Sequence, residues 1–118
     1  MNLRLLLPCL ALLAFAATPA QAGEQPSEAA GKAALTVLGE INGTALACQQ
    51  LAIVSRARNA VSTTAPKTRE NGEIFEHATN TAFLAQGQGG RCPEAMQLVE
   101  RLNAAESELA RAFATQRP

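Results

Sequence analysis

Two cysteines, Cys48 and Cys92, constrain the fold of this chain more than any other feature of its sequence. They stand 44 positions apart, and Cys9, the third cysteine, lies in an apolar stretch near the N-terminus. Two cysteines in an exported chain most simply form one disulfide. The chain-entropy model gives roughly 4 kcal/mol of stabilisation for closing a loop of this length. We therefore expect a Cys48–Cys92 disulfide. Metal binding and a reactive thiol are the less favoured alternatives, because neither cysteine has a CxxC or nearby histidine partner.

The expectation of export depends on the N-terminus, which resembles a cleavable signal peptide. Arg4 gives a short basic start, residues 5–17 are apolar, and Ala20-Gln21-Ala22 has the small residues of a cleavage site. The apolar run is shorter than the about 20 residues that a membrane-spanning helix needs. We expect residues 1–22 to be removed, with a retained N-terminal anchor as the alternative. The alanine-rich signal is typical of bacteria and predicts a periplasmic, or secreted, product without stable membrane insertion.

The composition of the remaining chain favours helices and argues against nucleic-acid binding. Without Arg4, nine basic residues face ten glutamates, so the basic excess typical of nucleic-acid-binding proteins is absent. The sequence contains no aspartate, and glutamate competes less than aspartate with the helical backbone. Residues 23–31 are predicted to be a flexible leader, although Ser27 and Glu28 could also start a helix. Residues 32–118 are predicted to form a single helical domain.

The longest helical pattern begins near Lys32 and fades beyond Val61. Its apolar residues recur at steps of three and four, as on one face of a helix: Leu38, Ile41, Ala45, Cys48 and Ala52. Gly39 and Gly43 belong to a second row, made of small residues. Each glycine costs around 1 kcal/mol inside a helix. The row therefore predicts either the close approach of a neighbouring backbone or a break in the helix at Gly39 or Gly43.

Two further helices follow a turn cluster at residues 62–66. The second helix is predicted over residues 68–86 and ends at the glycine-rich segment 87–90. The third is predicted to begin at Pro93, which suits a first helical position, and to have Arg111 in its last turn, where a cation is favourable. Both contain an apolar stripe: Phe75, Ala78, Ala82 and Ala85 in the second, and Ala95, Leu98, Leu102, Ala105, Leu109 and Ala112 in the third.

These elements predict an all-α fold, a small antiparallel three-helix bundle with one disulfide. A break of the first helix at Gly39 or Gly43 would give four helices. The second helix is about 20 residues, or roughly 30 Å, long and would return the chain to the level of Cys48. Cys92 would then lie beside Cys48, so that helix length and cysteine placement agree.

The same arrangement leaves the first helix before Gly43 without a neighbour of equal height. Its apolar residues would fold back at a glycine, or pack against a second copy or another protein. We therefore predict an interaction surface in this segment: Leu35, Leu38, Gly39, Ile41 and Gly43.

The sequence contains little that favours catalysis or a cofactor. His77 is the only histidine, and with Glu73, Glu76 and Thr81 it forms a polar patch at one-turn spacing. Such a patch could bind a metal weakly, but a glutamate-rich surface helix is the commoner explanation. There is no aspartate to orient His77 and no GxSxG motif, so we expect neither enzymatic activity nor a cofactor.

One group of charges suggests an alternative contact site. Arg56, Arg58, Lys67 and Arg69 follow one another without an intervening acid. They could bind an anionic partner. Cations near a helix C-terminus also interact favourably with the helix dipole, and we favour this second explanation.

The function that the sequence favours is therefore binding rather than catalysis. We expect a small exported protein that binds another envelope protein, or a second copy of itself, through its helix faces. An inhibitor, an immunity protein or an assembly accessory would fit. The alternative is a periplasmic stress chaperone that exposes apolar surface when it partly opens. An enzyme or ligand carrier would require a pocket around His77.

Overall fold

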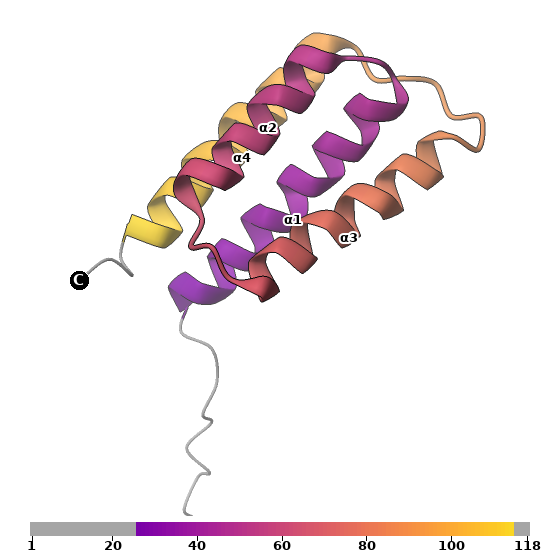
Figure 1. The fold of residues 1–118 in the computed structure, drawn as a ribbon. Coiled ribbons are helices and arrows are strands. Elements are labelled where there is room, and N and C mark those ends of the chain that lie inside the picture. Colours follow the sequence, from indigo (N-terminus) through magenta and orange to yellow (C-terminus); the bar gives the residue numbers. More distant parts are fainter. Residues whose placement is uncertain (1–25, 115–118) are drawn as a thin grey trace, which may run out of the picture.

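The computed structural model describes residues 26–114, which form four α-helices and no strand. Helices α1 (Pro26–Ala47), α2 (Leu51–Thr64), α3 (Arg69–Gln86) and α4 (Ala95–Ala114) alternate in direction along the chain (Figure 1). The prediction of an all-α fold with one disulfide is confirmed, with four helices rather than three. The predicted signal peptide, residues 23–25 and residues 115–118 lie outside the described residues.

Helix α1 begins earlier than expected, because residues 26–31 of the predicted flexible leader are helical. Pro26 occupies the first helical position and Glu28 lies in the first turn, where each is favourable. Gly31 is buried against α4, and a Cβ atom at this position would lie 2.7 Å from the ring of Phe113. The end of α4 therefore covers the start of α1, a contact between segments far apart in the sequence.

The long first helix of the prediction is divided into α1 and α2, but the division does not lie at a glycine. Helix α1 runs continuously through Gly39 and Gly43 and ends at Ala47. Gln49 has a φ of 57°, the left-handed conformation that usually favours glycine. Its N–H donates to the Leu46 carbonyl oxygen at 3.2 Å, and the Gln50 N–H donates to the Ala45 carbonyl oxygen at 2.8 Å. These two bonds form a Schellman motif with glutamine in the place of glycine.

Gln49→Gly is expected to stabilise the fold by about 1 kcal/mol, because glycine adopts the left-handed conformation without the Cβ clash. The Gln49 side chain is exposed, so Gln49→Ala should leave the free energy of unfolding nearly unchanged. Urea unfolding of the two variants and the wild type measures both differences. A loss of stability in Gln49→Gly would contradict the described turn.

Helix α1 is the centre of the fold. It contacts each of the other three helices, and α2 also contacts α4. Among the described helices, α3 contacts α1 alone. α1 is antiparallel to α4, because its Glu40 pairs with Arg101 while its Gly31 meets Phe113. It is parallel to α3, since Lys32 pairs with Glu70 near the start of both helices. This central position explains why α1 is apolar on more than one face.

Gly39 and Gly43 allow α3 to approach α1 closely, which confirms one of the two predicted reasons for the glycine row. A Cβ atom on Gly39 would lie 2.6 Å from the carbonyl oxygen of Phe75, and one on Gly43 would overlap the carbonyl oxygen of Thr79. Between them, Asn42 is fully buried and its Nδ2 donates to Thr79 Oγ1 at 3.1 Å. The contact therefore combines bare backbone with one buried hydrogen bond between the helices.

The remaining helix ends follow the local signals in the sequence. α2 ends before Pro66, and the Thr68 side chain caps α3 by accepting from the Asn71 N–H at 3.1 Å. α3 ends at the predicted glycine-rich segment. α4 begins at Ala95, two residues later than the predicted first position at Pro93. Most of the predicted stripe of α4 is buried: Leu98, Leu102, Ala105, Leu109 and Ala112. In α3, Phe75 and Ala78 are buried, whereas Ala85 is exposed.

Candidate interaction surface

The predicted interaction surface is part of the core, so this prediction requires correction. Leu35, Leu38 and Ile41 each have an exposed fraction of 0%, and Gly39 and Gly43 are buried against α3. The premise that they lack a neighbour of equal height is wrong, because the chain reverses at Gln49. The reversal places α2, α3 and α4 around α1, which covers these residues within a single chain. In this fold they offer no accessible side chain to a partner.

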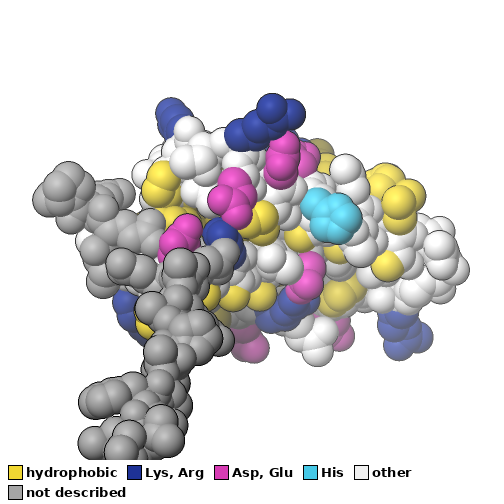
Figure 2. Space-filling model, turned by 90° about the horizontal axis from the view of Figure 1, so that it is seen from below, with side chains coloured by type: hydrophobic (Ala, Val, Ile, Leu, Met, Phe, Trp, Pro, Cys, Tyr) yellow, Lys and Arg dark blue, Asp and Glu magenta, His cyan; other side chains and the backbone are white. Residues whose placement is uncertain are grey.

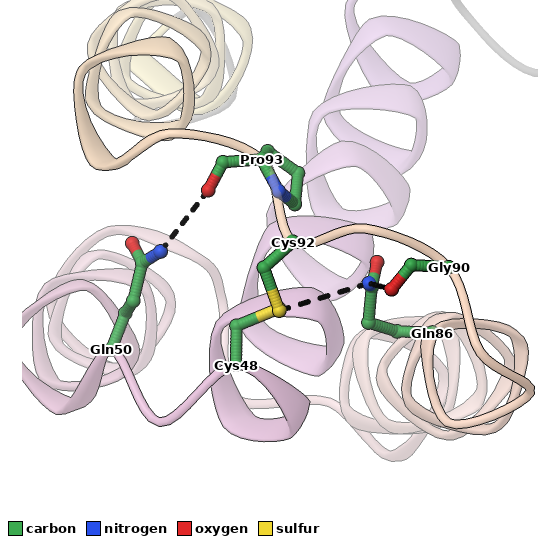
Figure 3. Close-up of a disulfide and its surroundings, with 6 residues drawn as sticks. All are labelled: Cys48, Gln50, Gln86, Gly90, Cys92 and Pro93. Atoms are coloured by element: carbon green, nitrogen blue, oxygen red, sulfur yellow. Dashed lines mark hydrogen bonds between the residues drawn. A yellow bond between two sulfur atoms is a disulfide. The ribbon is translucent and has the colours of Figure 1, made fainter.

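The disulfide between Cys48 and Cys92 is present, as predicted, with its Cα atoms 5.8 Å apart. It joins the end of α1 to the segment that precedes α4 (Figure 3). Gln50 Nε2 donates to the Pro93 carbonyl oxygen at 3.3 Å, and Gln86 Nε2 donates to the Gly90 carbonyl oxygen at 2.8 Å (Figure 3). These contacts tie the ends of four helices together, and we call this region the disulfide end.

The disulfide end exposes large apolar side chains. Leu51 is 68% exposed in the first turn of α2, Leu84 is 64% exposed in the last turn of α3, and Met96 is 69% exposed in the first turn of α4. Phe83 in α3 is also exposed. Among the described residues, these four are the large hydrophobic side chains that are exposed, and all come from helix termini at the disulfide end. We call them the end cluster.

A second candidate surface is a shallow apolar groove between α1 and α4, which we call the alanine groove. It has a volume of about 400 Å³. Arg101 and Glu108 lie on its α4 edge. The apolar lining is made mainly of alanines from the two helices: Ala30, Ala33, Ala34, Val37, Ala104 and Ala105.

Sequence reasoning missed both surfaces because it followed the apolar stripes that form the core. Leu84 and Met96 lie outside the predicted stripes of their helices, as do the exposed Ala33 and Ala104. Apolar residues that fall off a core stripe were the available signal. Such residues are common on protein surfaces, however, and the signal by itself does not identify a site.

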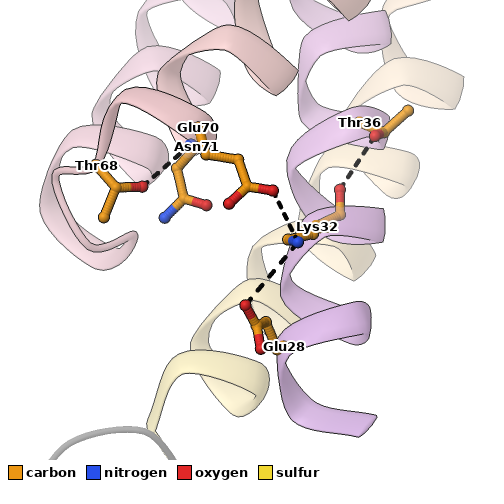
Figure 4. A network of polar contacts seen from close by, with 6 residues as sticks. All are labelled: Glu28, Lys32, Thr36, Thr68, Glu70 and Asn71. Atoms are coloured by element: carbon orange, nitrogen blue, oxygen red, sulfur yellow. Dashed lines mark hydrogen bonds and ion pairs between the residues drawn. The ribbon is translucent and has the colours of Figure 1, made fainter. Parts of the chain in front are cut away.

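The opposite end of the molecule carries a network of polar contacts. Lys32 Nζ lies 2.8 Å from a Glu70 carboxylate oxygen and 3.9 Å from one of Glu28, so a single cation bridges α1 and α3 (Figure 4). The capping bond from the Asn71 N–H to Thr68 lies beside it (Figure 4). This end therefore differs chemically from the apolar disulfide end.

The predicted basic group is not a single cluster of free cations. Arg56 binds Asn103 and Glu106 of α4, with distances of 2.8 and 2.9 Å, and Arg69 pairs with Glu73 at 2.9 Å. Exposed pairs of this kind contribute at most about 1 kcal/mol each. Figure 2 shows Lys and Arg side chains close to Glu side chains on one face, with hydrophobic side chains between them.

His77 is exposed on α3, in the same helix as Glu73 and Glu76. Across residues 26–114, no group of three or more His, Cys, Asp or Glu side chains is placed to hold a metal ion. None of the helices in this part of the chain is both long and apolar enough to cross a membrane.

Comparisons of the chain with protein-family models, with curated proteins and with solved structures found no match.

Proposed function

We propose that this chain is a small exported, non-enzymatic protein that binds another envelope protein through its disulfide end. The observation that carries this proposal is the end cluster: four large apolar side chains exposed at helix termini that the disulfide holds together. A disulfide is typical of oxidising compartments outside the cytoplasm. Together with the predicted bacterial signal peptide, it supports the periplasm as the place of action.

The energetics of the end cluster support binding. Burying an exposed leucine, phenylalanine or methionine side chain contributes about 1.5–3 kcal/mol. A few such residues supply most of the binding free energy of many protein interfaces. The end cluster lies on helix termini rather than on a long loop. Little of this chain therefore has to become ordered when a partner binds, which lowers the entropy cost of binding. The partner that fits is a protein with an apolar surface of its own.

Leu84→Glu and Met96→Glu test this function. Each places a charge where the partner would have to bury it, so each should reduce capture of the partner at least about tenfold. Asn59→Glu is the matched control, because Asn59 is exposed on α2 away from the disulfide end. Chemical cross-linking in envelope extract of the source bacterium, followed by mass spectrometry, measures capture.

The expected result is a protein that cross-links to the wild type and to Asn59→Glu but not to the two end-cluster variants. Unfolding curves should show that all three variants remain folded. The proposal is wrong if the wild type captures no protein, or if the end-cluster variants capture the same protein as strongly as Asn59→Glu does.

A further inference from the structure

The alanine groove has one positive and one negative side chain on the same edge, and this arrangement is complementary to the same edge in a second copy of the chain. Arg101 and Glu108 lie on its α4 edge, with Ala104 and Ala105 between them. The midpoint of positions 101 and 108 falls between the two alanines. When two α4 helices cross antiparallel at that midpoint, Arg101 of each copy comes opposite Glu108 of the other. The charge pattern is therefore complementary to its own two-fold image.

The side chains at the crossing point are small enough to allow this contact. Ala104 is exposed and Ala105 forms the wall of the groove. Helices that meet at such side chains can approach to an interaxial distance of about 8 Å. The apolar side chains of α1 in the groove, Ala33 and Val37 among them, would be covered at the same time. A second copy thus covers apolar surface on both helices.

Arg101 and Glu108 each have an ion-pair partner within the chain but remain exposed enough to pair with a second copy as well. Arg101 lies 3.4 Å from Glu40, and Glu108 lies 3.0 Å from Arg111, with all four side chains substantially exposed. In the two-fold arrangement, Arg101 would lie between Glu40 and the second copy's glutamate. Glu108 would lie between Arg111 and the second copy's arginine. Among these four residues of each copy, positive and negative groups alternate across the contact.

We infer that the protein forms a two-fold symmetric dimer through the alanine groove, with α4 packed antiparallel against α4 of the second copy. Charge complementarity selects a second copy over another protein as the occupant, because the pattern of Arg101, Ala104, Ala105 and Glu108 matches itself. The dimer does not use the end cluster, so it extends the proposed function and can fail or succeed independently of it.

Charge reversal tests the dimer directly. Arg101→Glu leaves two glutamates to face each other across the contact, and Glu108→Arg leaves two arginines. Each variant alone should raise the dimer dissociation constant at least about tenfold. An equimolar mixture of the two variants, and the double variant R101E/E108R, should both recover dimers, because opposite charges face each other again. Sedimentation equilibrium measures the masses, and circular dichroism checks that each chain is folded.

The register of the contact is tested by cross-linking. Ala104 lies next to the two-fold axis, so Ala104→Cys should form a disulfide between two copies under mild oxidation. Ala110→Cys is the control, because Ala110 is exposed on α4 but faces a hollow shared with α2.

Three results would each overturn the inference: a wild-type monomer at high protein concentration, charge reversals without effect on the dissociation constant, or equal cross-linking at both positions. A dimer whose two-fold axis runs parallel to the helices would place α4 of each copy against α1 of the other. The two Ala104→Cys side chains would then lie apart and would not cross-link.

Discussion

Replacing Gly43 with alanine is expected to lower the free energy of unfolding by about 2–3 kcal/mol, although alanine is the better helix former by about 1 kcal/mol. The added Cβ would overlap the carbonyl oxygen of Thr79 and lie 2.8 Å from the backbone nitrogen of Phe83. Both are backbone atoms of α3, so no side chain can rotate away and the whole helix must shift. The shift would also weaken the buried hydrogen bond between Asn42 and Thr79.

The control for Gly43→Ala is Gly72→Ala, in the first turn of α3. A Cβ atom at Gly72 would have nothing within 4 Å. Alanine should therefore stabilise that helix by about 0.5–1 kcal/mol. Thermal unfolding followed by circular dichroism would separate the two variants by more than 10 °C, at roughly 4–8 °C per kcal/mol for a domain of this size. Two alanines that stabilise the protein equally would show that α1 and α3 are not in backbone contact.

Removing the disulfide is the second large effect that we expect. Cys48→Ala combined with Cys92→Ala releases a loop of 44 residues and should cost roughly 4 kcal/mol of stability in the chain-entropy model. Small domains are stable by about 5–15 kcal/mol in total, so the double variant should lose from about a quarter to most of its stability. Urea unfolding of the double variant and the wild type measures the difference.

A reductant separates the effect of the bond from that of the two substitutions. Cys92 is exposed, so dithiothreitol should reach the disulfide and destabilise the wild type. The same reductant should leave the unfolding midpoint of the double variant unchanged. A double variant as stable as the oxidised wild type would show that packing of α1 and α4, rather than the disulfide, holds the disulfide end together.

The disulfide end links this stability to the proposed binding. Without the bond between Cys48 and Cys92, the links between this end and the segment before α4 include the hydrogen bond from Gln50 to Pro93. We expect the helix termini that carry Leu51, Leu84 and Met96 to separate more easily without the bond, although α2, α3 and α4 still pack on α1. The end cluster consequently depends on the covalent link for its arrangement as well as on its own apolar surface.

Much of the fold could be predicted because its signals are local. The stripe Leu98, Leu102, Ala105 and Leu109 is buried as its spacing indicates, and the turn before Pro66 and the glycine-rich end of α3 lie where expected. Each of these features depends on residues within a few turns of one another. The Cys48–Cys92 bond was predictable for another reason, since two cysteines outside the predicted signal peptide allow a single pairing.

The sequence by itself therefore determined the helical class, the disulfide and the helix ends at the turn before Pro66 and at the glycine-rich segment 87–90. It left open whether Gly43 marks a close neighbour or a break. Only the tertiary structure decided where the first helix ends and which of its faces are covered. Gln49 adopts a left-handed conformation that glycine or asparagine usually marks in a sequence and that glutamine does not. That single turn reverses the chain. As a result, Leu38 and Ile41 changed from a predicted binding surface to core. The alanine groove and the end cluster became the surfaces left open, because exposure depends on what the rest of the chain covers.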